Sequence, residues 1–353
     1  MVYLDNAATQ PMLKCVRDAM HDAETRFFAN ASALHTPGHV ALNEINKCRI
    51  ILAELINAQP EEIIFTSGAT ESNNTVIWTF HDCQIETSPL EHHSIIEMAK
   101  LHRGNKLPKL YSYMFANNET GEILKLPHIK KTEYLHSDLT QVLGKIPIDV
   151  KKLGLDYATF SAHKIGGPIG VGALYVRDGV PFKPLLVGGN QENKRRGGTY
   201  NTVGIIGFKA ALEYIRDNKT WEKYDSFVRE LRDNLAHRIL AEISGSSLNT
   251  DITCSKSLPN ILNMSFEASE GESIQLYLDA ERIIVSTGSA CAAGDIKPSH
   301  VLIAKTGDAE VAHSSIRFSF GLDNSIEDIN RVMEVLPDTI KKLQGMSTIE
   351  RKK

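Results

Sequence analysis

The chain has 353 residues, of which 42% are hydrophobic and 23% charged, and its formal net charge is −4. This is an ordinary composition for a globular protein of two domains, and a chain of this length buries enough surface to need no disulfides. The charge balance gives no support for nucleic-acid binding, and no stripe of basic residues stands out. No apolar stretch approaches the roughly 18 residues that a membrane span requires.

The N-terminal residues turn polar at once and lack the basic start and apolar core of a signal peptide. The cysteines are odd in number and widely scattered, so they indicate neither a disulfide framework nor a zinc site. They are Cys15, Cys48, Cys83, Cys254 and Cys291. We therefore expect a cytoplasmic protein in a reducing compartment, without a metal centre.

Helical spacing of apolar residues predicts amphipathic helices at 15–28 and 41–56, and seven short apolar or alternating runs predict strands. The predicted strands are 62–66, 84–87, 111–115, 134–138, 157–160, 172–176 and 184–187. From residue 203 the pattern changes to long amphipathic helices. We therefore predict a large domain at 15–205 and a small domain formed by 1–14 and 206–353.

The turn after the strand at 62–66 opens a predicted helix. Backbone N–H groups at a helix start bind phosphate, so this turn is a candidate phosphate site. Gly68 and Ala69 would let a phosphate approach the backbone, and Thr70 could add a hydroxyl. Simple helix capping by Ser67 or Thr70 would explain the same residues.

A lysine follows the strand at 157–160, in the stretch Ser161-Ala162-His163-Lys164 that precedes two glycines. Ligands of α/β proteins bind at the carboxyl ends of strands, and a lysine there can form a Schiff base with a carbonyl compound. Asp138 ends the preceding predicted strand, 26 residues earlier, so neighbouring parallel strands would bring both side chains to one sheet edge. Enzymes that use pyridoxal phosphate need this pair.

Two other polar stretches allow a structural or a functional interpretation. His92 and His93 would point to opposite faces of a strand, so they could not easily share a metal. An imidazole there could stack on a planar ring, move protons, or serve as a hydrogen-bonded structural histidine. Residues 117–121, Asn-Asn-Glu-Thr-Gly, are typical of a turn.

Cys291 and Arg317 are further candidates near the C-terminal end. Cys291 has only small neighbours in residues 286–294, which favour mobility and suit a thiol that attacks in one place and delivers in another. A lone cysteine is nevertheless more often a small buried apolar residue. Arg317 lies on the polar face of the strand predicted at 312–321. There it could bind a substrate carboxylate or serve as an ordinary ion-pair partner.

With these motifs in order, the sequence closely resembles the cysteine desulfurases of the NifS/IscS type, a branch of the fold-type-I pyridoxal-phosphate enzymes. The resemblance covers nearly the whole chain. Its motifs are Tyr3-Leu4-Asp5-Asn6-Ala7-Ala8-Thr9, Thr66-Ser67-Gly68-Ala69-Thr70-Glu71-Ser72, Glu91-His92, Asn117-Asn118-Glu119-Thr120-Gly121, Ser161-Ala162-His163-Lys164, Ser286-Thr287-Gly288-Ser289-Ala290-Cys291 and Ser314-Ser315-Ile316-Arg317-Phe318-Ser319. It implies an α/β fold with a mostly parallel seven-stranded sheet between helices, plus a smaller α+β domain.

The resemblance implies roles toward the cofactor pyridoxal 5'-phosphate. Lys164 would carry it, Asp138 would hold its ring nitrogen, Gln141 would contact its ring hydroxyl and His92 would stack over the ring. The phosphate would be bound by Ala69, Thr70, Ser161, His163 and, from the neighbouring subunit of a homodimer, Thr199.

The implied reaction converts L-cysteine to L-alanine and transfers the sulfur to Cys291 as a persulfide. Asn118 and Arg317 would hold the substrate, and His92 is our candidate to shuttle a proton. The expected acceptor is an iron–sulfur scaffold or a thiolation enzyme, and we expect neither membrane nor direct nucleic-acid binding. The alternatives are a selenocysteine lyase, a sulfur donor dedicated to DNA or tRNA modification, an aminotransferase that does not need Cys291, and a catalytically silent scaffold for sulfur-acceptor proteins.

The sequence departs from the family pattern in three places. His92 and Asn118 are only 26 residues apart, fewer than is usual in the family. The stretch Ala29-Asn30-Ala31-Ser32 stands where the family usually has Gly-Asn-Pro-Ser, and Gly197 replaces a residue that is more often serine. The short segment motivates the scaffold alternative but removes no chemical group.

Overall fold

The computed structural model describes residues 1–102, 104–253, 256–287 and 298–346. The chain forms two compact units, and each is described by itself. Unit 1 comprises Met1–Ala8, Ala116–Leu124 and Glu222–Lys353, and unit 2 comprises Thr9–Phe115 and Lys125–Trp221. The domain boundaries after residues 14 and 205 stay a prediction. No helix in the described ranges is long and apolar enough to cross a membrane.

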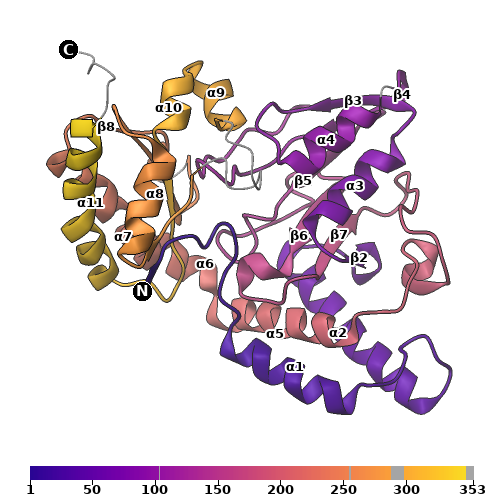
Figure 1. Cartoon of the computed structure of the whole chain (residues 1–353). Coiled ribbons are helices and arrows are strands. Elements are labelled where there is room, and N and C mark those ends of the chain that lie inside the picture. Colours follow the sequence, from indigo (N-terminus) through magenta and orange to yellow (C-terminus); the bar gives the residue numbers. More distant parts are fainter. Residues whose placement is uncertain (103, 254–255, 288–297, 347–353) are drawn as a thin grey trace. The chain divides into compact units, whose positions relative to one another are not determined.

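Unit 2 is built on a mixed sheet with the strand order β2-β7-β6-β5-β4-β3 (Figure 1). The strands are β2 (Ile63–Thr66), β3 (Cys83–Thr87), β4 (Lys106–Ser112), β5 (Tyr134–Asp138), β6 (Tyr157–Ser161) and β7 (Gly172–Val176). Strands β3 to β6 run parallel, whereas β7 runs antiparallel to both of its neighbours, β6 and β2. The α/β class and the mostly parallel sheet are thus confirmed.

The predicted strand count is wrong, because the described part of this sheet has six strands instead of seven. Residues 184–187 form no strand. Pro184 has no N–H to donate to a ladder, and Leu186 and Val187 are 42% and 85% exposed, so this apolar run has no buried face. The strand predicted at 111–115 is shifted, since β4 begins at Lys106 and ends at Ser112.

The helices of unit 2 pack in two groups. The helices are α1 (Lys14–Arg26), α2 (Thr36–Ile56), α3 (Ala69–Thr79), α4 (His93–Leu101) and α5 (Thr202–Asn218), with short 3₁₀ turns η1 (Pro60–Glu62), η2 (Ala162–Ile165) and η3 (Gln191–Lys194). Helices α1 and α2 pack on α5, whereas α3 packs on α4 and on the central strands (Figure 1). Apolar side chains of α3 and α4 meet the sheet in one buried cluster, which leaves β6 buried along its whole length.

Unit 1 contains an antiparallel sheet in the order β11-β9-β8 and the parallel pair β1-β10. Its strands are β1 (Val2–Tyr3), β8 (Ser246–Leu248), β9 (Ile261–Phe266), β10 (Ile283–Ile284) and β11 (Ser315–Ser319). Its helices are η4 (Tyr224–Val228), α7 (Arg229–Glu242), α8 (Gly271–Ala280), α9 (His300–Thr306), α10 (Ala309–His313) and α11 (Ile326–Met346), and α6 (Thr220–Lys223) spans the boundary between the units. Helices α7, α8 and α11 cover an apolar core that includes Val2 and Leu4 of the N-terminal segment and Ile340 of α11.

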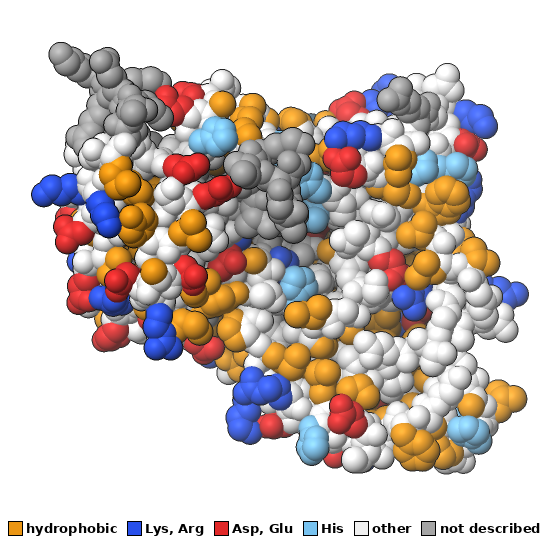
Figure 2. Space-filling view, viewed as in Figure 1, with side chains coloured by type: hydrophobic (Ala, Val, Ile, Leu, Met, Phe, Trp, Pro, Cys, Tyr) orange, Lys and Arg blue, Asp and Glu red, His pale blue; other side chains and the backbone are white. Residues whose placement is uncertain are grey.

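Acidic and basic side chains are interspersed on the face of the molecule shown in Figure 2. Several exposed ion pairs of the described residues lie within one helix, such as Lys14 with Asp18 at 2.6 Å and Lys100 with Glu97 at 2.7 Å. Pairs of this kind contribute at most about 1 kcal/mol each. The buried polar groups described below are therefore the ones that shape the candidate site.

Candidate active site

Lys164 lies in the short turn that follows β6, as the sequence predicts. The strand ends at Ser161, η2 carries His163 and Lys164, and Gly166 ends the turn with φ +73°. A side chain at position 166 would strike Leu13, because a Cβ there would lie 2.6 Å from its Cγ. The glycine therefore allows both the left-handed backbone and the close approach that hold this turn against the strand.

A second lysine, Lys145, lies beneath this turn. Its Nζ donates to the backbone carbonyl of Lys164 at 3.3 Å, and the residue is only 1% exposed. Burial, together with the charge of Lys164, lowers the pKa of Lys145 to about 7. Burial and the same two lysines lower the pKa of His163 to about 4, and its Nδ1 lies 3.1 Å from the hydroxyl of Thr9. His163 is thus neutral at pH 7.

Asp138 ends the strand next to β6, so the predicted adjacency of Asp138 and Lys164 at one sheet edge is confirmed. Strands β5 and β6 pair in parallel, with Asp138 opposite Thr159. The carboxylate accepts hydrogen bonds from the Asn73 side chain at 2.8 Å and from the Thr140 backbone N–H at 2.9 Å. Gln141, in the turn that follows, is 5% exposed.

The turn before α3 is a candidate phosphate site in the structure as well as in the sequence. Gly68 is the N-cap with φ +153°, and no side chain caps the helix, so the capping explanation by Ser67 or Thr70 is wrong. Strand β7 passes very close, because a Cβ on Gly172 would lie 2.6 Å from the Gly68 Cα. Ser161 Oγ lies 4.0 Å from the position of a Cβ on Gly68. Ala69 starts the helix and Thr70 is exposed.

His92 is the N-cap of α4 and does not lie on a strand. Its Nδ1 accepts from the Ser94 backbone N–H at 3.1 Å and lies 2.8 Å from Ser94 Oγ. Ser94 Oγ accepts in turn from the Asn73 side chain at 2.9 Å. The preceding Glu91 is fully buried and accepts from the Met114 backbone N–H at 2.6 Å, and burial raises its pKa well above the usual value.

The two predicted substrate residues of unit 1 are adjacent. Arg317 on β11 donates from Nη1 to the backbone carbonyl of Asn118 at 3.0 Å and from Nη2 to Asp5 at 2.7 Å. Its Nε has no hydrogen-bond partner among the described residues, although the side chain is only 3% exposed. A buried guanidinium with an unused N–H retains capacity for a further anionic partner.

Glu119 follows Asn118 in the same turn and is 4% exposed. Burial raises the pKa of Glu119 to about 7, against the opposing effects of Ser299 and Arg317. Ser299 donates its hydroxyl to this carboxylate and caps α9. Cys291 lies outside the described residues. Thr199 is exposed in the loop after η3, and its predicted role across subunits stays a prediction.

The donor set of unit 2 fits pyridoxal phosphate. Lys164 supplies an amine for the aldehyde, Asp138 supplies a carboxylate for the ring nitrogen, and the uncapped start of α3 suits the phosphate. Beside Asp138, the buried hydroxyl of Thr140 has no hydrogen-bond partner among the described residues, as expected of a group that faces a ligand. Lys145, with a pKa of about 7, is only partly charged at pH 7, and a dianionic phosphate nearby would favour its charged form.

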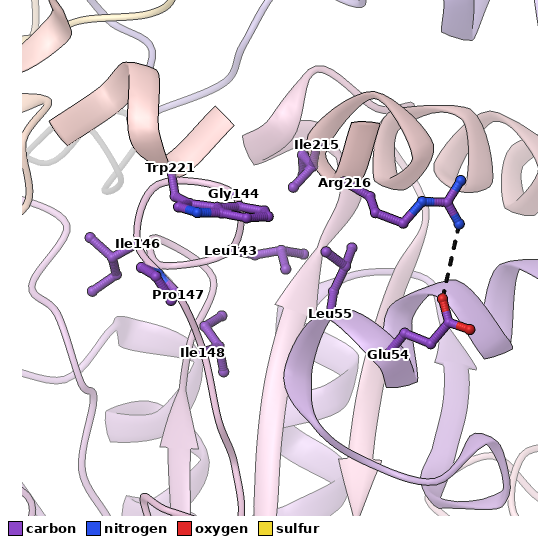
Figure 3. A pocket seen from close by; sticks show the side chains of 10 residues that line it. All are labelled: Glu54, Leu55, Leu143, Gly144, Ile146, Pro147, Ile148, Ile215, Arg216 and Trp221. Carbon is purple, nitrogen blue, oxygen red and sulfur yellow. Dashed lines mark ion pairs between the residues drawn. The ribbon is translucent and has the colours of Figure 1, made fainter. Parts of the chain in front are cut away.

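Two cavities of unit 2 are lined by other residues. The first has a volume of about 290 Å³ and is mostly apolar, with Trp221 across it and the ion pair of Arg216 and Glu54 (3.9 Å) at its side (Figure 3). The second, of about 730 Å³, is lined by the loop around Glu192, whose carboxylate forms a bidentate pair with Arg49 at 2.8 Å. Neither lining contains a predicted site residue.

Three polar residues of the site were not predicted from the sequence: the buried Asn73 and Lys145 and the partly buried Ser94. The sequence does contain a feature that singles out Lys145, because this lysine is the one charged residue in the otherwise apolar or small run 142–148. No feature of the sequence distinguishes Asn73 and Ser94 from the other polar residues of their helices.

Comparison with known proteins agrees with this arrangement. The sequence matches the family described as aminotransferase class-V over residues 2–107 and 104–332. It is 40% identical to the cysteine desulfurase IscS of Dictyoglomus turgidum, over 98% of this chain and 96% of that relative. The corresponding protein of Methanosarcina thermophila is 38% identical, over 99% and 95%.

Solved structures show the same likeness. The NifS-like protein of Rickettsia africae superposes with a TM-score of 0.86 at 30% identity, over 97% of this chain and 99% of that one. The structure of SspA in complex with cysteine superposes with a TM-score of 0.76 at 29% identity, over 91% and 99%.

The short segment after His92 is also visible in these matches. The two matched parts of the family meet at residues 104–107, between His92 and Asn118, and the alignment with the Dictyoglomus turgidum protein runs over 386 residues, more than the 353 of this chain. Relatives therefore carry residues that this chain lacks. The match over nearly the whole chain leaves one conclusion: the chain belongs to the class-V aminotransferase family, and it groups there with the pyridoxal-phosphate enzymes named cysteine desulfurases.

Proposed function

We propose that this protein is an L-cysteine desulfurase that produces L-alanine and a persulfide on Cys291. The observation that carries the proposal is the placement of Asp138 and Lys164 at the ends of two neighbouring parallel strands. Pyridoxal phosphate, when bound, supplies the electron-withdrawing ring that lets the Cα–H bond of an amino acid ionise. The relatives named cysteine desulfurases and the solved SspA–cysteine complex support cysteine as the substrate.

This chain's own residues carry the remaining steps. Lys164 binds the cofactor and, once its amine is released, takes the Cα proton. Asp138, held by Asn73 and the Thr140 N–H, keeps a negative charge for the ring nitrogen. Arg317 binds the substrate carboxylate with an N–H that no described residue uses.

Sulfur transfer is a displacement at the substrate sulfur. The Cys291 thiolate forms the new S–S bond while the substrate C–S bond breaks, and the substrate carbon then takes a proton. The products are L-alanine and a Cys291 persulfide, so one thiol and one cysteine are consumed without an external oxidant. The persulfide sulfur would then pass to an iron–sulfur scaffold or a thiolation enzyme. A persulfide must be protected from oxidation, and we therefore propose a cytoplasmic setting.

The decisive experiment measures alanine and sulfide release from L-cysteine with a reductant, for wild type, Cys291→Ala and Lys164→Ala. We expect equal amounts of both products from wild type and none from either variant. Keto-acid formation that survives Cys291→Ala would identify an aminotransferase. If the protein showed neither turnover nor a visible cofactor band, the result would favour a catalytically silent scaffold for sulfur-acceptor proteins. A faster reaction with selenocysteine than with cysteine would identify a lyase for that substrate.

We also propose a homodimer in which Thr199 of one subunit reaches the phosphate of the other. Large apolar side chains of unit 2 are strongly exposed, which supports an interface: Leu34 (90%), Val187 (85%), Phe28 (79%) and Ile169 (77%). Mixing Thr199→Ala with Lys164→Ala subunits tests this, because a mixed dimer regains one intact site only if Thr199 acts across the interface. No recovered activity in a mixed dimer would show that it does not.

A further inference from the structure

The hydrogen bonds at His92 define which ring nitrogen carries the hydrogen. The backbone N–H of Ser94 points at Nδ1 at 3.1 Å, and a backbone N–H can only donate. Nδ1 therefore presents its lone pair, and the hydrogen of the neutral ring lies on Nε2. The Ser94 hydroxyl, 2.8 Å from the same nitrogen, must then donate to it as well.

Asn73 fixes the direction of the next two hydrogen bonds. Its side-chain nitrogen lies 2.9 Å from Ser94 Oγ and 2.8 Å from Asp138 Oδ2, so one hydrogen goes to each. Asn73 is completely buried, and turning its amide would place the oxygen against the Asp138 carboxylate, oxygen to oxygen. Every hydrogen in the chain from Asp138 through Asn73 and Ser94 to His92 is thus assigned.

We propose that Asn73 and Ser94 are positioning residues that hold His92 as the Nε2–H tautomer and tie its ring to Asp138. In this state Nε2 is a hydrogen-bond donor. A proton could enter the ring only at Nδ1, where it would displace both the hydroxyl and the backbone N–H that caps α4. His92 therefore acts by stacking and by N–H donation, in place of the proton shuttle that the sequence suggested. The role of His92 rests on the proposed function, but its tautomer does not.

Nitrogen-15 NMR of the histidine-labelled protein tests the tautomer, first without cofactor and then with pyridoxal phosphate. The variant His92→Gln assigns the resonances of His92. A matched comparison is His35, which caps α2 by accepting the Gly38 N–H at 3.2 Å, and to whose Nδ1 no serine hydroxyl of the described residues donates. The variant His35→Gln assigns that ring.

We expect Nε2 of His92 to be protonated and Nδ1 unprotonated at pH 7, in both forms. A hydrogen on Nδ1, in either the neutral or the charged ring, would overturn the proposal. In Ser94→Ala the Nδ1 resonance should move, because the hydroxyl donor is lost while the backbone N–H remains. An unchanged Nδ1 resonance in Ser94→Ala would show that the Ser94 hydroxyl does not donate to His92, and would contradict its role as a positioning residue.

Asn73 has a neighbouring control on the same helix. Asn74 donates to the backbone carbonyl of Ser94 at 2.7 Å, whereas the hydrogen bonds to the Ser94 hydroxyl and to Asp138 come from Asn73. Asn73→Ala should shift the His92 resonances, and Asn74→Ala should not. Equal shifts in both variants would show a merely structural effect and contradict the proposal.

Kinetics then separate this inference from the proposed function. The alanine-release rate should fall by roughly twofold to tenfold in Ser94→Ala, the range of one neutral hydrogen bond. If wild type releases no alanine while His92 remains Nε2-protonated, the proposed function fails and the tautomer assignment stands. If wild type is active with Nδ1 protonated, the proposed function stands and this inference fails.

Discussion

Asp5 and Arg317 form an ion pair across 312 residues of sequence, with Asp5 Oδ1 only 2.7 Å from Arg317 Nη2. The arginine side chain is 3% exposed and the aspartate side chain 19%. This pairing leaves Nε, the N–H that we propose for the substrate, without a hydrogen-bond partner among the described residues. Asp5 therefore orients the arginine and compensates its charge before any substrate binds.

Asp5→Ala should lower the free energy of unfolding by about 3 kcal/mol, because it leaves a buried guanidinium without its counterion. Asp5→Asn should lower it less, since an amide oxygen can still accept the hydrogen bond. Urea unfolding measures both changes. The control is Glu281→Ala, which breaks the exposed pair with Arg331 (2.7 Å) and should change stability by less than about 1 kcal/mol. Equal losses in Asp5→Ala and Glu281→Ala would contradict the buried role.

Lys145 should make stability depend on pH in the alkaline range. Its folded pKa of about 7 lies below the reference value of 10.5, so between these values the unfolded chain binds the extra proton and stability rises with pH. Below pH 7 the full destabilisation is present. Lys145→Met removes it, so the stability difference between variant and wild type should shrink by up to about 1.4 kcal/mol per pH unit above pH 7. Parallel stability curves from pH 7 to pH 10 would show that Lys145 is charged in the folded protein.

Glu119 should have the opposite pH dependence in a lower range. Its folded pKa of about 7 lies above the reference value of 4.5, so the folded protein holds the extra proton between them and stability falls as pH rises. Glu119→Gln abolishes this contribution. The stability of the variant relative to wild type should therefore increase from about pH 5 to pH 7 and stay level above it, measured by thermal unfolding at each pH. A constant difference would mean that Glu119 titrates normally.

Gly172→Ala should lower stability by about 1–3 kcal/mol and weaken cofactor retention, because the new methyl group would overlap the backbone of Gly68. Chemical denaturation and the visible absorbance after dialysis measure the two effects. Gly345 in α11 is the matched control, since a Cβ there meets nothing within 4 Å. Gly345→Ala should be neutral or slightly stabilising. Unchanged stability in Gly172→Ala would contradict the close approach of β7 to the turn.

The central strands and the position of Lys164 were predictable because their physical causes are local. An apolar run such as 157–160 must be buried on both faces, and the polar residues after it mark the strand end. The adjacency of Asp138 and Lys164 then follows from the short connections of parallel strands. The apolar residues of 184–187 gave the same local signal, but no neighbouring strand covers them.

The rest depends on tertiary contacts that no local pattern contains. Strand β7 enters the sheet antiparallel between β6 and β2, and its residues pair with residues of β2 that lie more than 100 positions earlier in the sequence. Burial of Asn73 and Lys145 depends on that packing, since the same residue types on an open helix or loop would be solvated. His92 was expected on a strand, and its tautomer became readable only from the backbone N–H that it accepts.

Strand β1 pairs with β10, so Val2 has its partner at Ile283, and Asp5 pairs with a residue on β11. During synthesis the N-terminal segment leaves the ribosome first, yet nearly the whole chain must follow before either partner exists. Val2 and Asp5 therefore stay without these partners until residues 283 and 317 have been synthesised. Arg317 therefore gains the Asp5 counterion only after synthesis has passed β11, 312 residues beyond the aspartate.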